Sequence, residues 1–277
     1  MKFSIVIPTR NRNEMLEQCV ASLQPGTQFV DEREYEILVT DDGLAAKDVC
    51  RKFSATRWVA GPARGPAANR NNGARYARGE WIIFVDDDCI PDPGFLWAYS
   101  QAISDNPGMK VFEGRTYPER ARQRMDEDAP INETGGCLWS CNFMIEKRLF
   151  DSLGGFNEGF PYAAMEDVEF ADRVRKITQV IFVHQASVLH PWRLVADPAT
   201  KYKRAFESHK IYFRINPEAI QKFRVGGLCV QFASSIVRNT LKDVIRFRGR
   251  GIQFPLQYHF FQLRLIIHIA RLKLRIS

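Results

Sequence analysis

The stretch Trp81-Ile82-Ile83-Phe84-Val85-Asp86-Asp87-Asp88 joins five apolar residues to three consecutive aspartates. A short apolar run without a polar residue is typical of a strand that is buried on both faces, as in a parallel sheet. Three adjacent carboxylates repel one another unless water or a cation neutralises them. The stretch therefore predicts a central strand whose carboxyl end carries a cation-binding acidic cluster, with a solvated acidic turn as the alternative.

The residues around this strand predict a sheet of the same kind. Short apolar runs alternate with segments of helical spacing, and the expected elements are strand 3–7, helix 13–23, strand 35–40, a strand near 58–59 and helix 66–77. This β-α-β-α order predicts an α/β fold with a mostly parallel, doubly wound sheet flanked by helices. Ligands of such sheets bind where the strands end. Thr9-Arg10-Asn11 and Asp41-Asp42 also follow strands, so we expect them to meet the aspartate triplet at one edge.

The second hundred residues have a looser pattern. The polar segment 115–134 is expected to be a mobile loop or a partly helical excursion over the site. The remaining expected elements are strand 137–145, helix 146–153, helix 166–176 with Glu166-Asp167 in its first turn, and strands 180–183 and 187–189.

Charge divides the chain into two parts. Residues 198–277 contain 16 Lys and Arg residues against 3 acidic residues, a net charge of +13, whereas the whole chain carries +7. Residues 1–197 therefore carry −6. We expect a catalytic domain over 1–197 and a basic helical region over 198–277, with different tasks.

The basic region has amphipathic patterns. Arg264, His268, Arg271 and Arg275 recur at helical spacing, and Arg238, Lys242 and Arg246 do so in the segment 228–247. Such a pattern is typical of a helix that lies on an anionic membrane surface. The alternative is a helical subdomain that packs on the catalytic domain or on a second chain as a homo-oligomer.

Cysteine usage and hydropathy suggest the compartment. The six cysteines lack the paired spacing of a structural zinc site and indicate reduced thiols in a cytosolic protein. The N-terminal run is too short for a signal peptide, and no stretch is apolar for the roughly 18 residues of a membrane span. We expect a cytoplasmic protein, peripheral on the inner face of the cell membrane.

Five motifs in order resemble the signature of family 2 glycosyltransferases with the GT-A fold. They span about residues 1 to 195, and they are Phe3 to Arg12, Asp41-Asp42-Gly43, Pro66 to Ala74, Asp86-Asp87-Asp88 and Glu166-Asp167. Each motif alone is weak evidence, whereas five in the right order are specific.

The resemblance implies a donor pocket and a metal site. The positions similar to the family's nucleotide-sugar pocket are Pro8, Thr9, Arg10, Asp42, Arg64, Asn69, Arg70, Asp86 and Asp87. Asp88 resembles the metal ligand, with Asp86 sharing the coordination, and His190 resembles a further ligand that some members use. His184 is the rival histidine, and a structural role is the alternative for either one. The implied cofactor is Mn²⁺ or Mg²⁺.

The resemblance also implies the acceptor side. Asp167 matches the catalytic base that removes a proton from the acceptor hydroxyl, and Glu166 is expected beside it as a second catalytic residue. An acidic helix start is the alternative for the pair. Trp139 and Asn142 are placed for the acceptor, with core packing as the alternative for Trp139.

The function implied is metal-dependent, inverting transfer of a sugar from a nucleotide-diphosphate sugar, UDP-linked first of all. The acceptor would be a hydroxyl of a glycan or lipid-linked glycan in cell-surface polysaccharide synthesis. A nucleotidyltransferase is the alternative enzyme, but Pro8-Thr9-Arg10 stands where its Gly-rich phosphate loop is expected. A nucleic-acid-binding protein would explain the basic region but not the aspartates, so no nucleic acid partner is expected.

Overall fold

The computed structural model describes residues 1–276, and the chain divides into two compact units. The first unit contains Met1–Glu119 and Pro130–Pro191. The second contains Arg120–Ala129 and the residues from Trp192 onward. Each unit is described by itself below.

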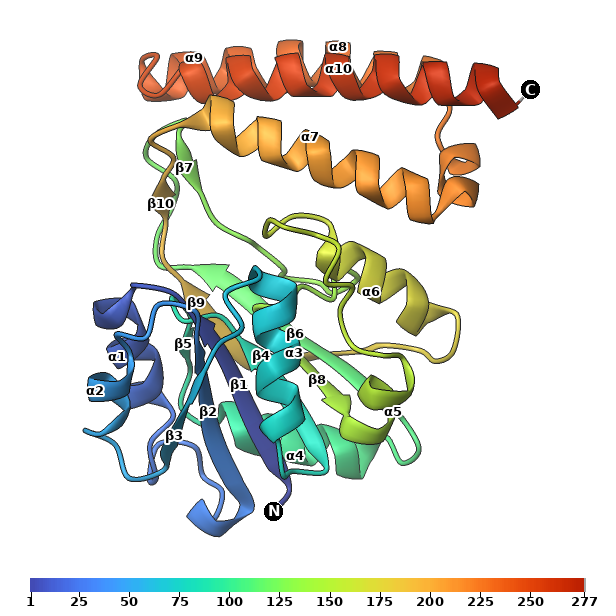
Figure 1. The fold of residues 1–277 in the computed structure, drawn as a ribbon. Helices are drawn as coiled ribbons and strands as arrows, with labels where there is room; N and C mark the ends of the chain where they lie inside the picture. The colour runs from blue at the N-terminus through green and yellow to red at the C-terminus, as the bar shows by residue number, and fades with distance from the viewer. Residues whose placement is uncertain (277) are drawn as a thin grey trace. The chain divides into compact units, whose positions relative to one another are not determined.

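The first unit is built on an eight-stranded sheet (Figure 1). Its strand order is β3-β2-β1-β4-β8-β6-β9-β5. The strands are β1 (Phe3–Thr9), β2 (Tyr35–Asp41), β3 (Thr56–Ala60), β4 (Trp81–Val85), β5 (Ile90–Pro91), β6 (Val111–Pro118), β8 (Asn142–Glu146) and β9 (Ile181–His190). The half from β3 to β4 is parallel throughout, and β6 pairs in parallel with β9. The other pairings are antiparallel. The predicted mostly parallel α/β sheet is thus confirmed.

Helices cover both faces of this sheet (Figure 1). They are α1 (Asn13–Ser22), α2 (Lys47–Cys50), α3 (Pro66–Tyr76), α4 (Phe95–Asp105), α5 (Lys147–Ser152) and α6 (Glu166–Arg175), with a 3₁₀ turn η1 at Glu32–Glu34. Ile83 and Val85 of β4 pack in one core with α1 and α4, whereas Phe84 packs in the other with α3, α5 and α6. Successive side chains of a strand point to opposite faces. The unbroken apolar run of β4 therefore reflects burial on both sides.

In the middle of the chain, the helical alternative for segment 115–134 is not present, whereas irregular backbone with a short strand is, and the two separate strands expected at 180–183 and 187–189 were wrong. Segment 115–134 contains no α-helix, because β6 extends to Pro118 and β7 (Glu127–Asp128) then pairs with β10 (Arg193–Leu194) in the second unit. The two strands expected at 180–183 and 187–189 form the single strand β9, whose pairing with β6 shifts register opposite Gly114 and Arg115. An irregularity of this kind interrupts the alternation of side chains, so that one strand has the sequence pattern of two.

The second unit is mainly helical. Its helices are α7 (Pro198–Ile215), the 3₁₀ segment η2 (Pro217–Lys222), α8 (Val225–Ser234), the π segment η3 (Ser235–Thr240), α9 (Leu241–Phe247) and α10 (Gln253–Ile276). α7 begins where the Asp197 carboxylate accepts a hydrogen bond from the Thr200 amide, with Pro198 in its first turn. α10 contacts both α7 and α8 (Figure 1). Over residues 1–276, no helix combines the length and the apolar character that a membrane crossing requires.

A buried arginine joins three separate elements of the first unit. Arg70 of α3 lies 2.7 Å from the Asp86 carboxylate, just after β4, and 3.2 Å from the Glu166 carboxylate at the start of α6. The Arg70 and Glu166 side chains are almost completely buried. Removing one partner of a buried ion pair leaves an uncompensated charge that is costly to bury. Arg70 therefore holds the position of the two acidic segments relative to α3.

We predict that Arg70→Met lowers the free energy of unfolding by about 3–5 kcal/mol, because Asp86 and Glu166 lose a buried cation. Urea unfolding followed by circular dichroism measures this change. Arg75→Met on the same helix is the matched control, since Arg75 is 62% exposed in its pair with Glu158 and should cost less than about 1 kcal/mol. Equal losses in the two variants would contradict the role assigned to Arg70.

Candidate active site

Three strands of the first unit end near one another and bring polar side chains together. Thr9 ends β1, the aspartate triplet follows β4, and His190 ends β9. The Thr9 hydroxyl donates a 2.7 Å hydrogen bond to the Asp87 carboxylate, which is completely buried. The predicted convergence of the first and third polar clusters is therefore present, and β9 adds a histidine to it.

Arg12, which the sequence reading did not select, binds two of the aspartates. Its guanidinium lies 2.6 Å from the Asp87 carboxylate and 3.0 Å from that of Asp88. The Arg12 side chain is 40% exposed, whereas both aspartates are buried. One partly exposed cation thus neutralises two buried anions, and it does so from the residue that precedes α1.

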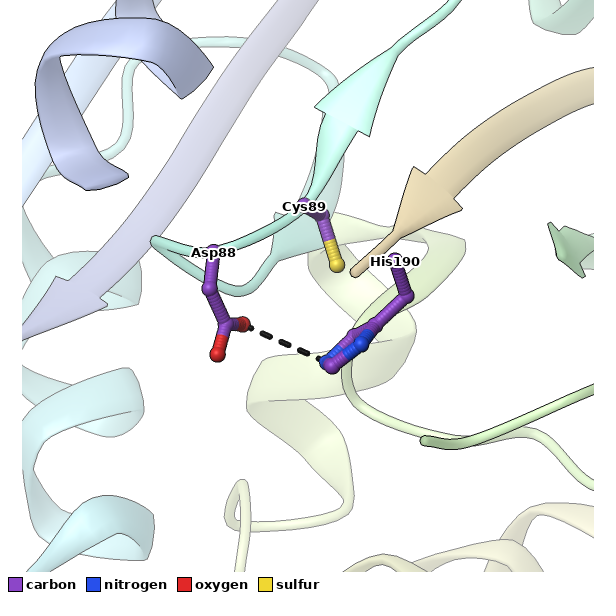
Figure 2. A group of neighbouring side chains, drawn as sticks. All are labelled: Asp88, Cys89 and His190. Carbon is purple, nitrogen blue, oxygen red and sulfur yellow. Dashed lines mark ion pairs between the residues drawn. The ribbon is translucent and has the colours of Figure 1, made fainter. Parts of the chain in front are cut away.

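Asp88 and His190 face each other in Figure 2, with the Cys89 thiol beside them. The His190 Nε2 atom lies 3.5 Å from the Asp88 carboxylate, and the possible ligand atoms of all three residues lie within 4.8 Å of one another. The other ring nitrogen of His190, Nδ1, lies 2.8 Å from the Pro191 carbonyl, to which it donates. In a neutral imidazole this bond leaves the Nε2 lone pair toward Asp88. Two acceptors that face each other need a proton or a cation between them.

The chemistry of this group suits a hard or borderline divalent ion. Carboxylate and imidazole ligands are those of Mn²⁺, and a carboxylate alone suits Mg²⁺. Cys89 fits such an ion less well, because a thiolate is a soft ligand that hard divalent ions do not prefer. A hydrogen bond with Cys141 and burial raise the pKa of its thiol well above the usual value. A metal site here would therefore rest on Asp88 and His190.

The two other residues considered as metal ligands lie elsewhere. Asp86 is bound to Arg70, and it is absent from the group formed by Asp88, Cys89 and His190. His184 is exposed in the middle of β9, six residues before the strand ends. The triplet is thus divided, and the structure does not group Asp86 with Asp88 as ligands.

The second polar cluster lies beside the first, where Asp41 pairs with Thr9 and the Asp42 amide donates to the Thr9 carbonyl. The Asp42 carboxylate accepts a 2.9 Å hydrogen bond from the Ala63 amide, and burial raises its pKa. A β-carbon at Gly61 would lie 2.2 Å from this carboxylate, so the absence of a side chain there permits the approach. The neighbouring Asp41 is completely buried and accepts from the amides of Gly43 and Ala46. Asp41 therefore shapes the loop, and Asp42 is the member that remains partly exposed.

Pro8 is buried in β1, where it pairs with Thr40 of β2. Arg10 is exposed beside Asp42. The buried Asn69 amide donates to the carbonyls of Thr9 and Thr40, and its oxygen accepts from the Thr40 hydroxyl. Its polar atoms are therefore used inside the protein, so the expectation that Asn69 contacts a nucleotide finds no support in its geometry.

The two arginines expected at a diphosphate have other partners. Arg64 is 61% exposed and pairs with Glu158 at 2.9 Å, a surface contact that a ligand can displace. Arg70 is 4% exposed and enclosed by Asp86 and Glu166. Its guanidinium is buried between carboxylates in this structure, and direct phosphate contact by Arg70 stays a prediction.

Glu166 and Asp167 begin α6 directly after Met165, which has a positive φ of 72°. Burial, together with the charge of Asp167, raises the pKa of Glu166 to about 7. Burial also raises the pKa of Asp167, whose residue surface remains partly accessible. A carboxylate with a raised pKa is a stronger base than an ordinary aspartate. Glu166 forms a buried ion pair with Arg70, whereas Asp167 is partly accessible and is the member of the pair that a substrate can reach.

The expected acceptor residues are mostly structural. Asn142 in β8 is buried, its oxygen accepts from the Tyr99 hydroxyl, and its amide donates to the carbonyls of Arg115 and Ala186. The polar atoms of Asn142 are thus bonded inside the protein, and contact with an acceptor stays a prediction. Trp139 is partly buried against one of the two cores, as the packing alternative supposed.

Comparison with known proteins places this geometry in context. The profile of glycosyl transferase family 2 matches residues 4–154. A poly(ribitol-phosphate) beta-glucosyltransferase of Bacillus spizizenii is 34% identical over 147 residues, which are 47% of this chain and 23% of that protein. A GalNAc(5)-diNAcBac-PP-undecaprenol beta-1,3-glucosyltransferase of Campylobacter jejuni is 33% identical over 57% of this chain and 56% of its own length.

Solved structures show the same fold. S. aureus TarS 1-349 in complex with UDP-GlcNAc matches with a TM-score of 0.58 over 75% of this chain and 65% of that chain, at 18% identity. The chain spans less than two thirds of the length of these curated relatives. The family profile covers more than half of the chain and includes the first four polar motifs, from Thr9 to the aspartate triplet. The chain therefore belongs to glycosyl transferase family 2, and its first unit has the GT-A fold.

Proposed function

We propose that the protein is a metal-dependent, inverting glycosyltransferase that uses a UDP-linked sugar. The observation that carries the proposal is the pairing of Asp88 with His190 beside Asp87, at the strand ends where ligands of such sheets bind. The relative in complex with UDP-GlcNAc supports the choice of donor. Asp42 and the exposed Arg10 supply a carboxylate and a cation on the nucleoside side of this edge.

Asp88 and His190 would hold Mn²⁺ or Mg²⁺. When bound, the ion neutralises the charge that develops on the diphosphate as it leaves. Asp87, held by Thr9 and Arg12, would orient the ribose and the donor sugar. The exposed Arg64 can exchange Glu158 for a phosphate oxygen, because a surface ion pair is weak.

Asp167 would act as the base. It accepts the proton of the acceptor hydroxyl while that oxygen attacks the anomeric carbon from the side opposite the nucleotide, which inverts the configuration. Proton removal by a placed carboxylate contributes about 10²- to 10⁴-fold to a rate. Glu166 would keep the base in place through Arg70, rather than touch the acceptor.

The acceptor proposed is a hydroxyl of a glycan or a lipid-linked glycan in cell-surface polysaccharide synthesis. The support is the activity of two relatives, a poly(ribitol-phosphate) beta-glucosyltransferase and a beta-1,3-glucosyltransferase that acts on an undecaprenol-linked glycan. Such acceptors lie at membranes. We therefore also propose a peripheral position on the inner face of the cell membrane, for which the basic second unit offers the contact.

The first prediction concerns the donor. UDP-linked sugars with Mn²⁺ should raise the melting temperature of the protein more than GDP-, dTDP- or CMP-linked sugars do, because a ligand that binds only the folded state stabilises it. A thermal-shift series with and without Mn²⁺, and with EDTA as the metal-free control, measures this. If no nucleotide sugar stabilises the protein in the presence of metal, the proposed function is refuted.

The second prediction separates the base from the metal site. Asp167→Asn should lower the rate of transfer by at least about 100-fold and leave donor binding intact, because only proton removal is lost. Asp88→Ala should weaken the binding of both Mn²⁺ and UDP-sugar. Calorimetry and a transfer assay measure these effects, with Asp151→Asn, an exposed residue of α5, as control. Normal turnover in either variant would remove that residue from its assigned task.

The third prediction concerns Arg12. Its guanidinium lies on the two carboxylates that border the proposed metal site, so it opposes a second cation there. Arg12→Gln should therefore tighten Mn²⁺ binding without nucleotide by roughly tenfold, since one nearby charge is worth about 1–2 kcal/mol in a partly exposed site. Electron paramagnetic resonance of free Mn²⁺ measures this. Arg33→Gln, a surface arginine paired with Asp31, is the control. Unchanged or weaker binding would show that Arg12 does not compete.

A further inference from the structure

The last helix, α10, has three distinct sides, and two of them are occupied. One side packs on α7, where the rings of Tyr202 and Phe261 lie 5.6 Å apart and those of Phe206 and His268 lie 5.7 Å apart. A second side meets α8 and the π segment, where His259 contacts the Phe232 ring and the Thr240 hydroxyl. These contacts account for the buried aromatic residues of the helix.

The third side of α10 is apolar and exposed. Large side chains recur along it at steps of four, three, four and seven residues: Leu256, Phe260, Leu263, Ile267 and Leu274. This spacing places them on one face of a helix. Leu274 is 78% exposed. A soluble helix that packs on two neighbours has no internal reason to carry a third apolar stripe.

The α8–α9 segment has the same character. α8 is built mostly of apolar and small residues, yet none of them is buried. Large apolar side chains recur along the segment at steps of seven, four and four residues: Val230, Val237, Leu241 and Ile245. Ile245 is 80% exposed. Two adjacent elements of one unit therefore present apolar side chains that the described chain does not cover.

Basic side chains border both stripes. On α10, Arg264 and Arg271 each stand four residues after an apolar residue of the stripe. The Arg264 guanidinium lies 5.7 Å from the centre of the Phe260 ring and 4.3 Å from that of Phe206 on α7. Arg238, Lys242 and Arg246 are exposed on the α8–α9 segment. His268, expected among these basic groups, is instead packed on Phe206. Burial lowers the pKa of its imidazole, and the nearby cations lower it further. The same burial therefore disfavours a positive charge on His268.

We propose that the exposed faces of α8–α9 and α10 bind the surface of a bilayer that contains anionic lipid. An apolar stripe bordered by Lys and Arg is the composition of a helix that lies in the headgroup region, with its apolar side chains among the acyl chains. Anionic headgroups attract the bordering cations. The proposal deepens the peripheral position stated above, because it names the side chains that enter the lipid.

Charge favours a bilayer over two other possible partners of these faces, a second copy of the chain and a nucleic acid. Residues 198–277 carry +13, so a second copy seated on the same face would bring two strongly basic surfaces together. A nucleic acid would satisfy the cations, but its phosphates would leave the leucine and isoleucine side chains in water. A bilayer with anionic headgroups satisfies both the charged and the apolar groups.

Flotation with phosphatidylcholine vesicles, with and without phosphatidylglycerol, tests the proposal on the full chain. The wild-type protein should float with the mixed vesicles and lose most of this binding in high salt. Leu241→Asp with Ile245→Asp, and separately Phe260→Asp with Ile267→Asp, should each lower the partition coefficient by at least about tenfold, since two buried side chains are lost from the lipid. Phe29→Asp with Ile177→Asp, both exposed in the first unit, is the matched control and should float as the wild type does.

Vesicle binding can be absent while the proposed transferase activity is present, because the vesicles contain neither donor nor metal. The surface assignment is overturned if the wild type does not float while UDP-sugar still stabilises it, or if the control pair loses as much binding as the two test pairs. It is also overturned if sedimentation shows a dimer that the test pairs dissolve and no variant binds vesicles. Circular dichroism of each variant checks that helix content is unchanged.

Discussion

The acidic edge of the first unit depends on one buried guanidinium. Arg70 lies between Asp86 and Glu166, and these residues follow β4 and begin α6 respectively. A planar guanidinium can bond two carboxylates in different directions, which the single ammonium of lysine does less well. Since α6 also carries Asp167, the position of the candidate base relative to the end of β4 is set by this contact. The site is therefore assembled by charge pairing as much as by the sheet.

The three consecutive aspartates have three different environments. Asp86 is paired with Arg70, Asp87 is held by Thr9 and Arg12, and Asp88 lies between Arg12 and His190. Crowded like charges are stable here because Arg70 pairs with Asp86, while Arg12 pairs with both Asp87 and Asp88.

Much of the fold could be predicted from the sequence, because burial on both faces leaves an unbroken apolar run such as β4 and because polar residues at strand ends share an edge. The partners of individual side chains could not be predicted in this way. Arg12 lies on a loop with no periodic pattern, and its contact with Asp87 joins residues 75 positions apart in the chain. Arg70 and Asn69 belong to a polar run that suggests ligand contact, whereas tertiary packing uses both inside the protein. The roles of the site residues in catalysis stay predictions.

The second unit is discontinuous in sequence, and this has a consequence for protein engineering. The short segment Arg120–Ala129 lies far upstream of α7, yet the Met125 amide donates to the Arg250 carbonyl and Arg122 pairs with Asp243. A truncation after residue 197 would therefore remove the partners of that segment and uncover Met125, which is 1% exposed. A chimera that exchanges this unit between relatives has to carry both pieces, because the C-terminal piece alone is an incomplete folding unit.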